Sequence, residues 1–111
     1  MSDTNAENET PVLDLLARMT ADSLETSSLD AETLILVRVA ALVAIGAPAV
    51  SYALNLEAAG EMGIDPEEIR GVLAAVAPIV GTARVAAATG NIVKALAVEL
   101  EVAELDSQDD V

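Results

Sequence analysis

The segment GIDPEEIRGVL, residues 63–73, carries the strongest local signal in this chain. Asp65 is a typical N-cap residue, Pro66 suits the first helical position, and Glu68 stands where it can reach back to the cap. Gly63, just before them, is typical of the residue that follows a helix end. The segment therefore predicts that one helix closes and another opens within a few residues.

The first helix of the chain is predicted from Thr10 and Pro11, which are typical of an N-cap and of the first helical position. Apolar residues then recur at helical spacing on one face: Val12, Leu15, Leu16 and Met19. Residues 20–29 are rich in Ser, Thr and Asp, so we expect them to connect this short amphipathic helix to the next one.

The second and third helices are predicted on either side of a Gly-Ala-Pro bend. Asp30 is suited to cap the second helix, which is apolar on nearly all sides up to Ile45 and is therefore expected to be buried. Gly46 ends it, and Pro48 is suited to the first position of a third helix that runs to Met62.

Two further helices complete the predicted fold. The helix that opens at Pro66 is expected to stop near Pro78, and Gly81 marks a bend. A last helix is expected over residues 83–100, after which the chain frays. No strand-like alternation is sustained anywhere, so we predict an all-α fold, a compact bundle of about five helices.

The composition indicates one helical domain that assembles with copies of itself. We expect this domain over residues 11–103, between a disordered acidic N-terminus (1–10) and a disordered acidic tail (104–111). A chain of 111 residues fits a single domain. Its mean hydropathy of +0.49 is high for a small monomer, because so small an interior cannot hide this many aliphatic side chains. A homo-oligomer is therefore expected.

Charge and missing residue types exclude several functions. Nineteen acidic and five basic residues give a net charge of −14, and Tyr52 is the single aromatic residue, so we expect no nucleic-acid partner. The chain has no cysteine and no histidine, which removes thiol chemistry and the commonest transition-metal ligands. We therefore expect no cofactor and no metal site.

A membrane span is not expected, although residues 39–56 carry no formal charge. Gly46 and Pro48 interrupt this run near its middle, and each remaining piece is too short to cross a bilayer. The polar, acidic first residues lack the features of a signal peptide, so a cytoplasmic location is expected.

A longer pattern extends the opening segment in both directions. The Gly-Ala-Pro bend is followed by AAGEMGIDPEEIRGVL (58–73) and then by APIVGTARVAAA (77–88). The pattern resembles the carboxymuconolactone decarboxylase-like family, which includes the alkylhydroperoxidase D branch, over roughly residues 29–97. This resemblance implies an all-helical domain that assembles into trimers or hexamers.

The resemblance does not extend to the family's chemistry. The peroxidase branch carries a Cys-x-x-Cys-x-x-x-His motif, and counting back from Gly63 places its three residues at Pro48, Ser51 and Asn55. The family's preceding Glu falls near Ile35 or Leu36, which are apolar. Peroxidase activity is therefore excluded, and no catalytic residue is assigned.

Five residues remain as candidates for binding or assembly. Ser51 and Asn55 share a helix face where the resemblance implies a pocket, and they could hold a small anionic ligand or serve structure. Tyr52 is expected at an interface, with its ring packed and its hydroxyl in contact with water. Arg38 and Arg84 either hold the anion or form ion pairs, since a guanidinium cannot be neutralised.

The sequence favours a non-peroxidatic, oligomeric binding or structural module. The alternative is an enzyme that decarboxylates a small organic acid or processes a lactone, with Arg38 or Arg84 for electrostatic stabilisation and Asn55 or Ser51 for orientation. A third hypothesis is that the acidic tail joins the protein to a larger complex.

Overall fold

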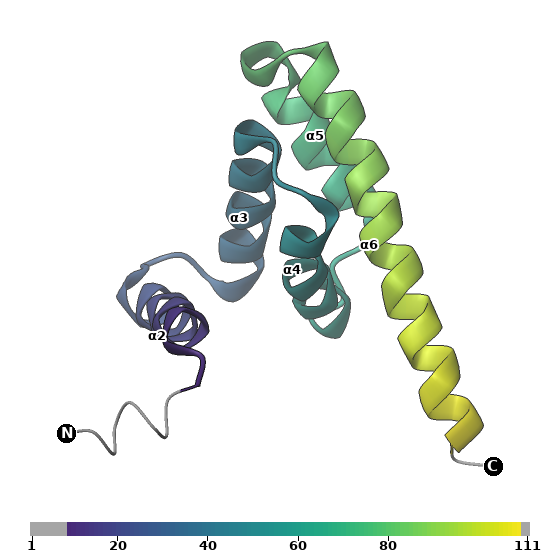
Figure 1. The fold of residues 1–111 in the computed structure, drawn as a ribbon. Helices are drawn as coiled ribbons and strands as arrows, with labels where there is room; N and C mark the ends of the chain where they lie inside the picture. Colours follow the sequence, from purple (N-terminus) through teal and green to yellow (C-terminus); the bar gives the residue numbers. More distant parts are fainter. Residues whose placement is uncertain (1–8, 110–111) are drawn as a thin grey trace. The chain divides into compact units, whose positions relative to one another are not determined.

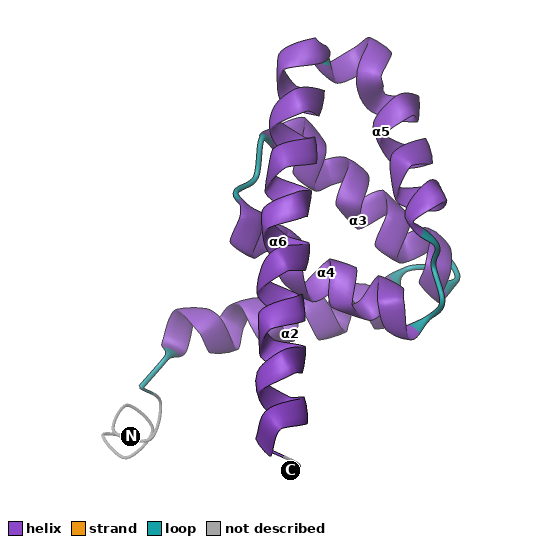
Figure 2. Ribbon diagram, turned by 90° about the vertical axis from the view of Figure 1, so that its right-hand side faces the viewer, coloured by secondary structure: helices purple, strands orange, loops and turns teal. Residues whose placement is uncertain are grey.

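The computed structural model describes residues 9–109 of the chain, and its side chains over residues 9–97. These residues form helices joined by short loops and contain no strand (Figure 2), which confirms the all-α prediction. The chain divides between Ala31 and Glu32 into two compact units. Residues 1–8, most of the expected disordered N-terminus, and the last two residues of the expected tail lie outside the described part.

The first unit contains one described helix, α2 (Pro11–Thr26), with Pro11 at its first position as predicted. Thr10 precedes it, but its hydroxyl donates to the Asp14 carboxylate at 3.4 Å instead of capping the backbone. The connector predicted from residue 20 begins only at Ser27, because helix formers such as Leu24 outweigh the weak helix propensity of the Ser and Thr residues.

The bend in the second unit joins α3 (Ala31–Ile45) to α4 (Ala49–Glu61). Gly46 has a φ of 69°, and the N–H of Ala47 donates to the Leu42 carbonyl at 3.0 Å, which is the hydrogen-bond pattern of a Schellman helix end. Pro48 occupies the N-cap of α4, one position before the one predicted.

The opening segment folds as its residues predict. Gly63 has a φ of 76°, and the N–H of Ile64 donates to the Ala59 carbonyl at 2.9 Å, which closes α4. Asp65 then caps α5 (Pro66–Val80), because its carboxylate accepts a hydrogen bond from the Glu67 N–H at 2.8 Å.

The last two helices are longer than predicted. Pro78 lies inside α5, which continues to Val80, because a proline in the final turn removes only one helical hydrogen bond. The helix ends at Gly81, whose φ is 89° and whose N–H donates to the Ala77 carbonyl. The last helix, α6 (Thr82–Asp109), continues beyond residue 100 into the segment expected to be disordered.

The second unit has a core to which α3 contributes as well as α4, α5 and α6, and α6 packs along α4 and α5 (Figure 1). Its most deeply buried side chains are Val39 and Val43 of α3 and Tyr52 of α4. Small residues of α6, Ala88 and Ala95, let the helices approach closely. The whole core cluster comprises Leu34, Ile35, Val39, Val43, Ala47, Tyr52, Leu56, Ala59, Ile64, Ile69, Ala88, Ile92 and Ala95.

We predict that Gly46→Ala lowers the free energy of unfolding by about 1–2 kcal/mol, because an L side chain is strained at this positive φ. An added Cβ would also lie 2.9 Å from a guanidinium nitrogen of Arg84. The matched control is Gly71→Ala in α5, where nothing lies within 4 Å of an added Cβ. It should raise the same free energy by about 1 kcal/mol. Urea denaturation of both variants tests this, and equal stabilities would contradict it.

Candidate functional site

The bend between α3 and α4 is held against α6 by two long-range hydrogen bonds. The Arg84 guanidinium donates to the Ala44 carbonyl at 2.8 Å, and the Asn91 amide donates to the Ala47 carbonyl at 3.3 Å. Arg84 thus places a positive charge at the C-terminal end of α3, where the helix dipole is negative. The two donors are seven residues apart, so they share one face of α6.

The residues predicted for ligand binding lie on the two helices that flank this bend and on α6. Ser51 and Asn55 are half-buried one turn apart on α4, and Arg38 is half-buried on α3, where it has an interaction partner. Arg84 is exposed, and its guanidinium already donates a hydrogen bond to the Ala44 carbonyl. Binding of an anion by these four residues stays a prediction.

Tyr52 has a different environment from the one expected. Its side chain is 0% exposed within the core, so its hydroxyl is not in contact with water at a surface. The hydroxyl has no hydrogen-bond partner among the described residues, and burial raises its pKa above the ordinary value of 10.0. An interface role for Tyr52 stays a prediction, but its ring is already packed by its own chain.

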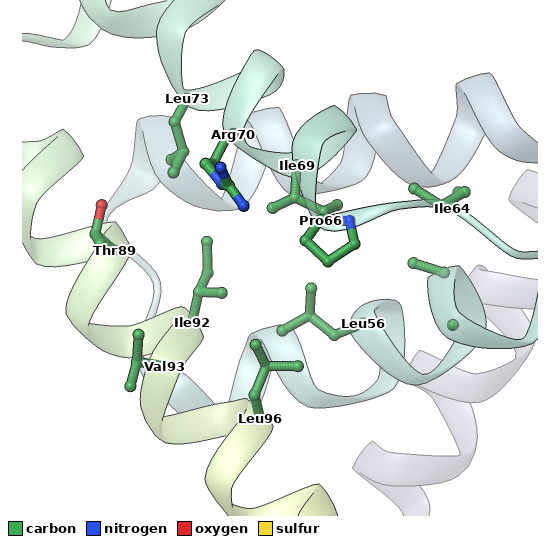
Figure 3. A pocket seen from close by; sticks show the side chains of 12 residues that line it. Leu56, Ile64, Pro66, Ile69, Arg70, Leu73, Thr89, Ile92, Val93 and Leu96 are labelled. Carbon is green, nitrogen blue, oxygen red and sulfur yellow. The ribbon is translucent and has the colours of Figure 1, made fainter.

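Sequence reasoning missed a groove between α4, α5 and α6. It has a volume of about 500 Å³, and Leu56, Ile69 and Ile92 point into it from the three helices (Figure 3). A volume of this size with mostly apolar walls suits a ligand or an apolar side-chain cluster. The lining consists of Leu56, Ala59, Gly60, Ile64, Pro66, Ile69, Arg70, Leu73, Thr89, Ile92, Val93 and Leu96.

The groove is almost uncharged. Arg70 is its single charged lining residue, and its guanidinium lies 3.5 Å from the Glu67 carboxylate. Both side chains of this pair are mostly exposed, so the pair contributes little to stability. Thr89 is the groove's hydroxyl residue, and its hydroxyl already donates to the Val85 carbonyl at 2.9 Å. The sequence signal available for this site was the cationic Arg70 beside the apolar stripe of α5.

A second hollow lies beside the first turns of α4. It has a volume of about 520 Å³ and is lined by Ala49, Val50, Ala53, Lys94, Ala95 and Ala97. Lys94 is its charged residue, and the rest of the lining is aliphatic. The hollow thus adjoins Pro48 and Ser51, two of the positions matched to the redox motif.

Two features are absent from the described residues. Among them, no group of three or more carboxylates is placed to hold a metal ion. The helices they form are too short or too polar for any to traverse a lipid bilayer.

Comparison with known proteins gives one match. The model of the carboxymuconolactone decarboxylase family matches residues 10–91, a range that includes α2 and ends inside α6. No curated protein and no solved structure shows significant similarity to the chain.

We predict that Tyr52→Phe raises the free energy of unfolding by about 1 kcal/mol at neutral pH, because it removes a buried hydroxyl that lacks a partner. The wild type should also lose stability as the pH rises above 10.0, since the unfolded chain releases the phenolic proton before the folded one. The phenylalanine side chain of the variant cannot titrate, so the variant should not show this loss of stability. Denaturation curves of both proteins from pH 8 to 11 test this. A less stable variant at neutral pH would contradict the prediction.

We predict that Arg84→Met lowers the free energy of unfolding by about 1 kcal/mol, because the Ala44 carbonyl and the end of α3 lose their charged donor. Arg18→Met is the matched control, since Arg18 is exposed on α2 and the same atoms are exchanged. Its effect should stay within about 0.5 kcal/mol. Urea denaturation at one protein concentration compares them, and equal effects would refute a structural role for Arg84.

Proposed function

The chain belongs to the carboxymuconolactone decarboxylase family, and from this premise we propose that it is a non-peroxidatic member that acts as a homo-oligomeric binding or structural module. One observation carries the proposal: the sequence has no cysteine and no histidine, and Pro48, Ser51 and Asn55 stand at the positions matched to the redox motif. We also propose a cytoplasmic location.

The replaced residues cannot perform the motif's chemistry. Thiol-dependent peroxide reduction needs a thiolate that is oxidised and a second thiol that restores it. Neither proline nor an unactivated serine hydroxyl supplies such a step, and the Asn55 amide cannot accept a proton at neutral pH. The positions of the motif are therefore free to serve packing and hydrogen bonding.

The surface of the second unit supports assembly. Val50 and Leu54, one turn apart on α4, are 78% and 77% exposed, and Ile45 at the end of α3 is 72% exposed. Val50 and Leu54 are neighbours on one helix face, and adjacent apolar side chains at this level of exposure are typical of a surface that is covered by a partner. The resemblance to family members that form trimers or hexamers makes a second copy of the chain the natural partner.

A second candidate function rests on the groove. Its volume of about 500 Å³, its apolar walls and its single arginine would suit a small apolar carboxylate. An enzyme acting on a small organic acid or lactone thus remains the alternative. This alternative requires that the protein binds such an acid and converts it. If the groove is the site, the Arg70→Met variant should lose both the binding and the conversion of the acid.

We predict that native mass spectrometry of the purified protein gives three or six copies of the 11.3 kDa chain, because the apolar surface needs covering. The protein should consume no hydrogen peroxide in the presence of dithiothreitol beyond the rate of the reductant alone. Leu54→Gln should weaken the assembly, whereas Glu68→Gln, an exposed change on α5, should leave it intact. A monomer, or thiol-dependent peroxide turnover, would refute the proposal.

A further inference from the structure

The helix α2 presents an apolar stripe that nothing covers within its own unit. Leu15 and Leu16 lie near the middle of this stripe, and both are about half exposed. No residue of α2 is buried. The stripe, at helical spacing along one face, consists of Val12, Leu15, Leu16 and Met19.

The second unit presents a complementary surface. The groove between α4, α5 and α6 is apolar over nearly all of its lining, and Val93 on its wall is 61% exposed. Amphipathic helices bind grooves of this kind through residues at i, i+3, i+4 and i+7, which is the spacing of the α2 stripe. One chain therefore carries both an apolar helix face and an apolar groove.

We propose that α2 of one copy binds, through its apolar stripe, in the groove between α4, α5 and α6 of a second copy. The inference rests on the oligomer put forward under the proposed function and adds to it a contact that is distinct from the exposed Val50 and Leu54 surface of α4. The two surfaces differ, so the contact is heterologous, and copies joined by such contacts close into a ring when the rotation between them allows it.

Charge favours this occupant. The helix α2 carries three acidic residues, Asp14, Asp22 and Glu25, against one basic residue, Arg18. The charged lining residue of the groove is Arg70, whose partner Glu67 is 3.5 Å away and mostly exposed. Asp22 stands seven residues after Leu15 and therefore flanks the stripe, so Arg70 can turn from this weak pair to the Asp22 carboxylate of a docked α2.

The extent of the family match also favours it. The match begins at residue 10, so α2 is part of the family domain and not an appendage to it. Its own unit supplies no partner surface for the large apolar residues of this helix, and an amphipathic helix requires one. A small ligand in the groove would leave this stripe in water, whereas a second copy covers both surfaces.

Because the chain has no cysteine, single engineered cysteines test the contact directly. Leu16→Cys is placed on the α2 stripe and Val93→Cys on the groove wall, each in a separate full-length chain, one of them isotopically heavy. The two are mixed and exposed to a short bifunctional maleimide. The control replaces Leu16→Cys with Ala21→Cys, which lies on the acidic face of α2 near Asp14 and Glu25.

We predict that the Leu16 and Val93 variants form the mixed cross-linked dimer about tenfold faster than the Ala21 and Val93 variants, because docking raises the effective concentration of the two thiols. Equal rates would overturn the inference. A chain that carries both Leu16→Cys and Val93→Cys should form cross-links between chains. The yield of these cross-links should fall when an excess of the wild-type chain is added. A cross-link within single chains, unaffected by dilution, would overturn it in favour of docking onto the chain's own groove.

A second comparison uses no cross-linker and measures the mass of the assembly. Leu16→Glu should reduce the mass seen by size-exclusion chromatography with light scattering, whereas Ala21→Glu, with the same added charge, should not. Circular dichroism confirms that both remain helical. An oligomer that survives Leu16→Glu and gives no mixed cross-link overturns the α2 contact but leaves the proposed oligomer standing. A wild-type monomer overturns both.

Discussion

The attachment of the α3–α4 bend to α6 is the constraint on which the second unit depends. Gly46 alone permits many exit directions for the chain, because glycine has no side chain to restrict it. The hydrogen bonds from Arg84 to the Ala44 carbonyl and from Asn91 to the Ala47 carbonyl select one of these directions. With α4 aligned along α6, the core can close around Tyr52, and the groove takes its walls from α4, α5 and α6.

This attachment also gives a packing role to the start of α4, which the proposed function matches to the family's redox motif. The start of α4 is needed in the same place for packing, because Ala47 and Tyr52 are buried there. Pro48 serves as the N-cap of α4, and its carbonyl accepts the Ser51 N–H at 3.0 Å. A fold that needs this turn for stability can replace the reactive residues without losing the turn.

Local sequence signals predicted most of the helix ends, whereas contacts between residues far apart in the chain could not be predicted from the sequence. The caps and glycines around residues 46, 63 and 66 act within a few residues, so the sequence alone located those helix ends. The end of α2 and the passage of α5 through Pro78 were missed, because weak helix formers and one lost hydrogen bond are outweighed by the rest of the helix. The role of Arg84 was missed because its acceptor lies 40 residues away in the sequence.

The arrangement of apolar residues carries a further argument about how so small a chain can be stable. A domain of this size buries a limited fraction of its surface, and this one leaves large side chains exposed on both units. The net charge of −14 keeps such a chain soluble but opposes close approach of copies, so association needs apolar contact large enough to offset that repulsion. A helix seated in a groove supplies such contact along its apolar stripe, and it leaves Asp14 and Glu25, on the opposite face of α2, in water, where salt screens them.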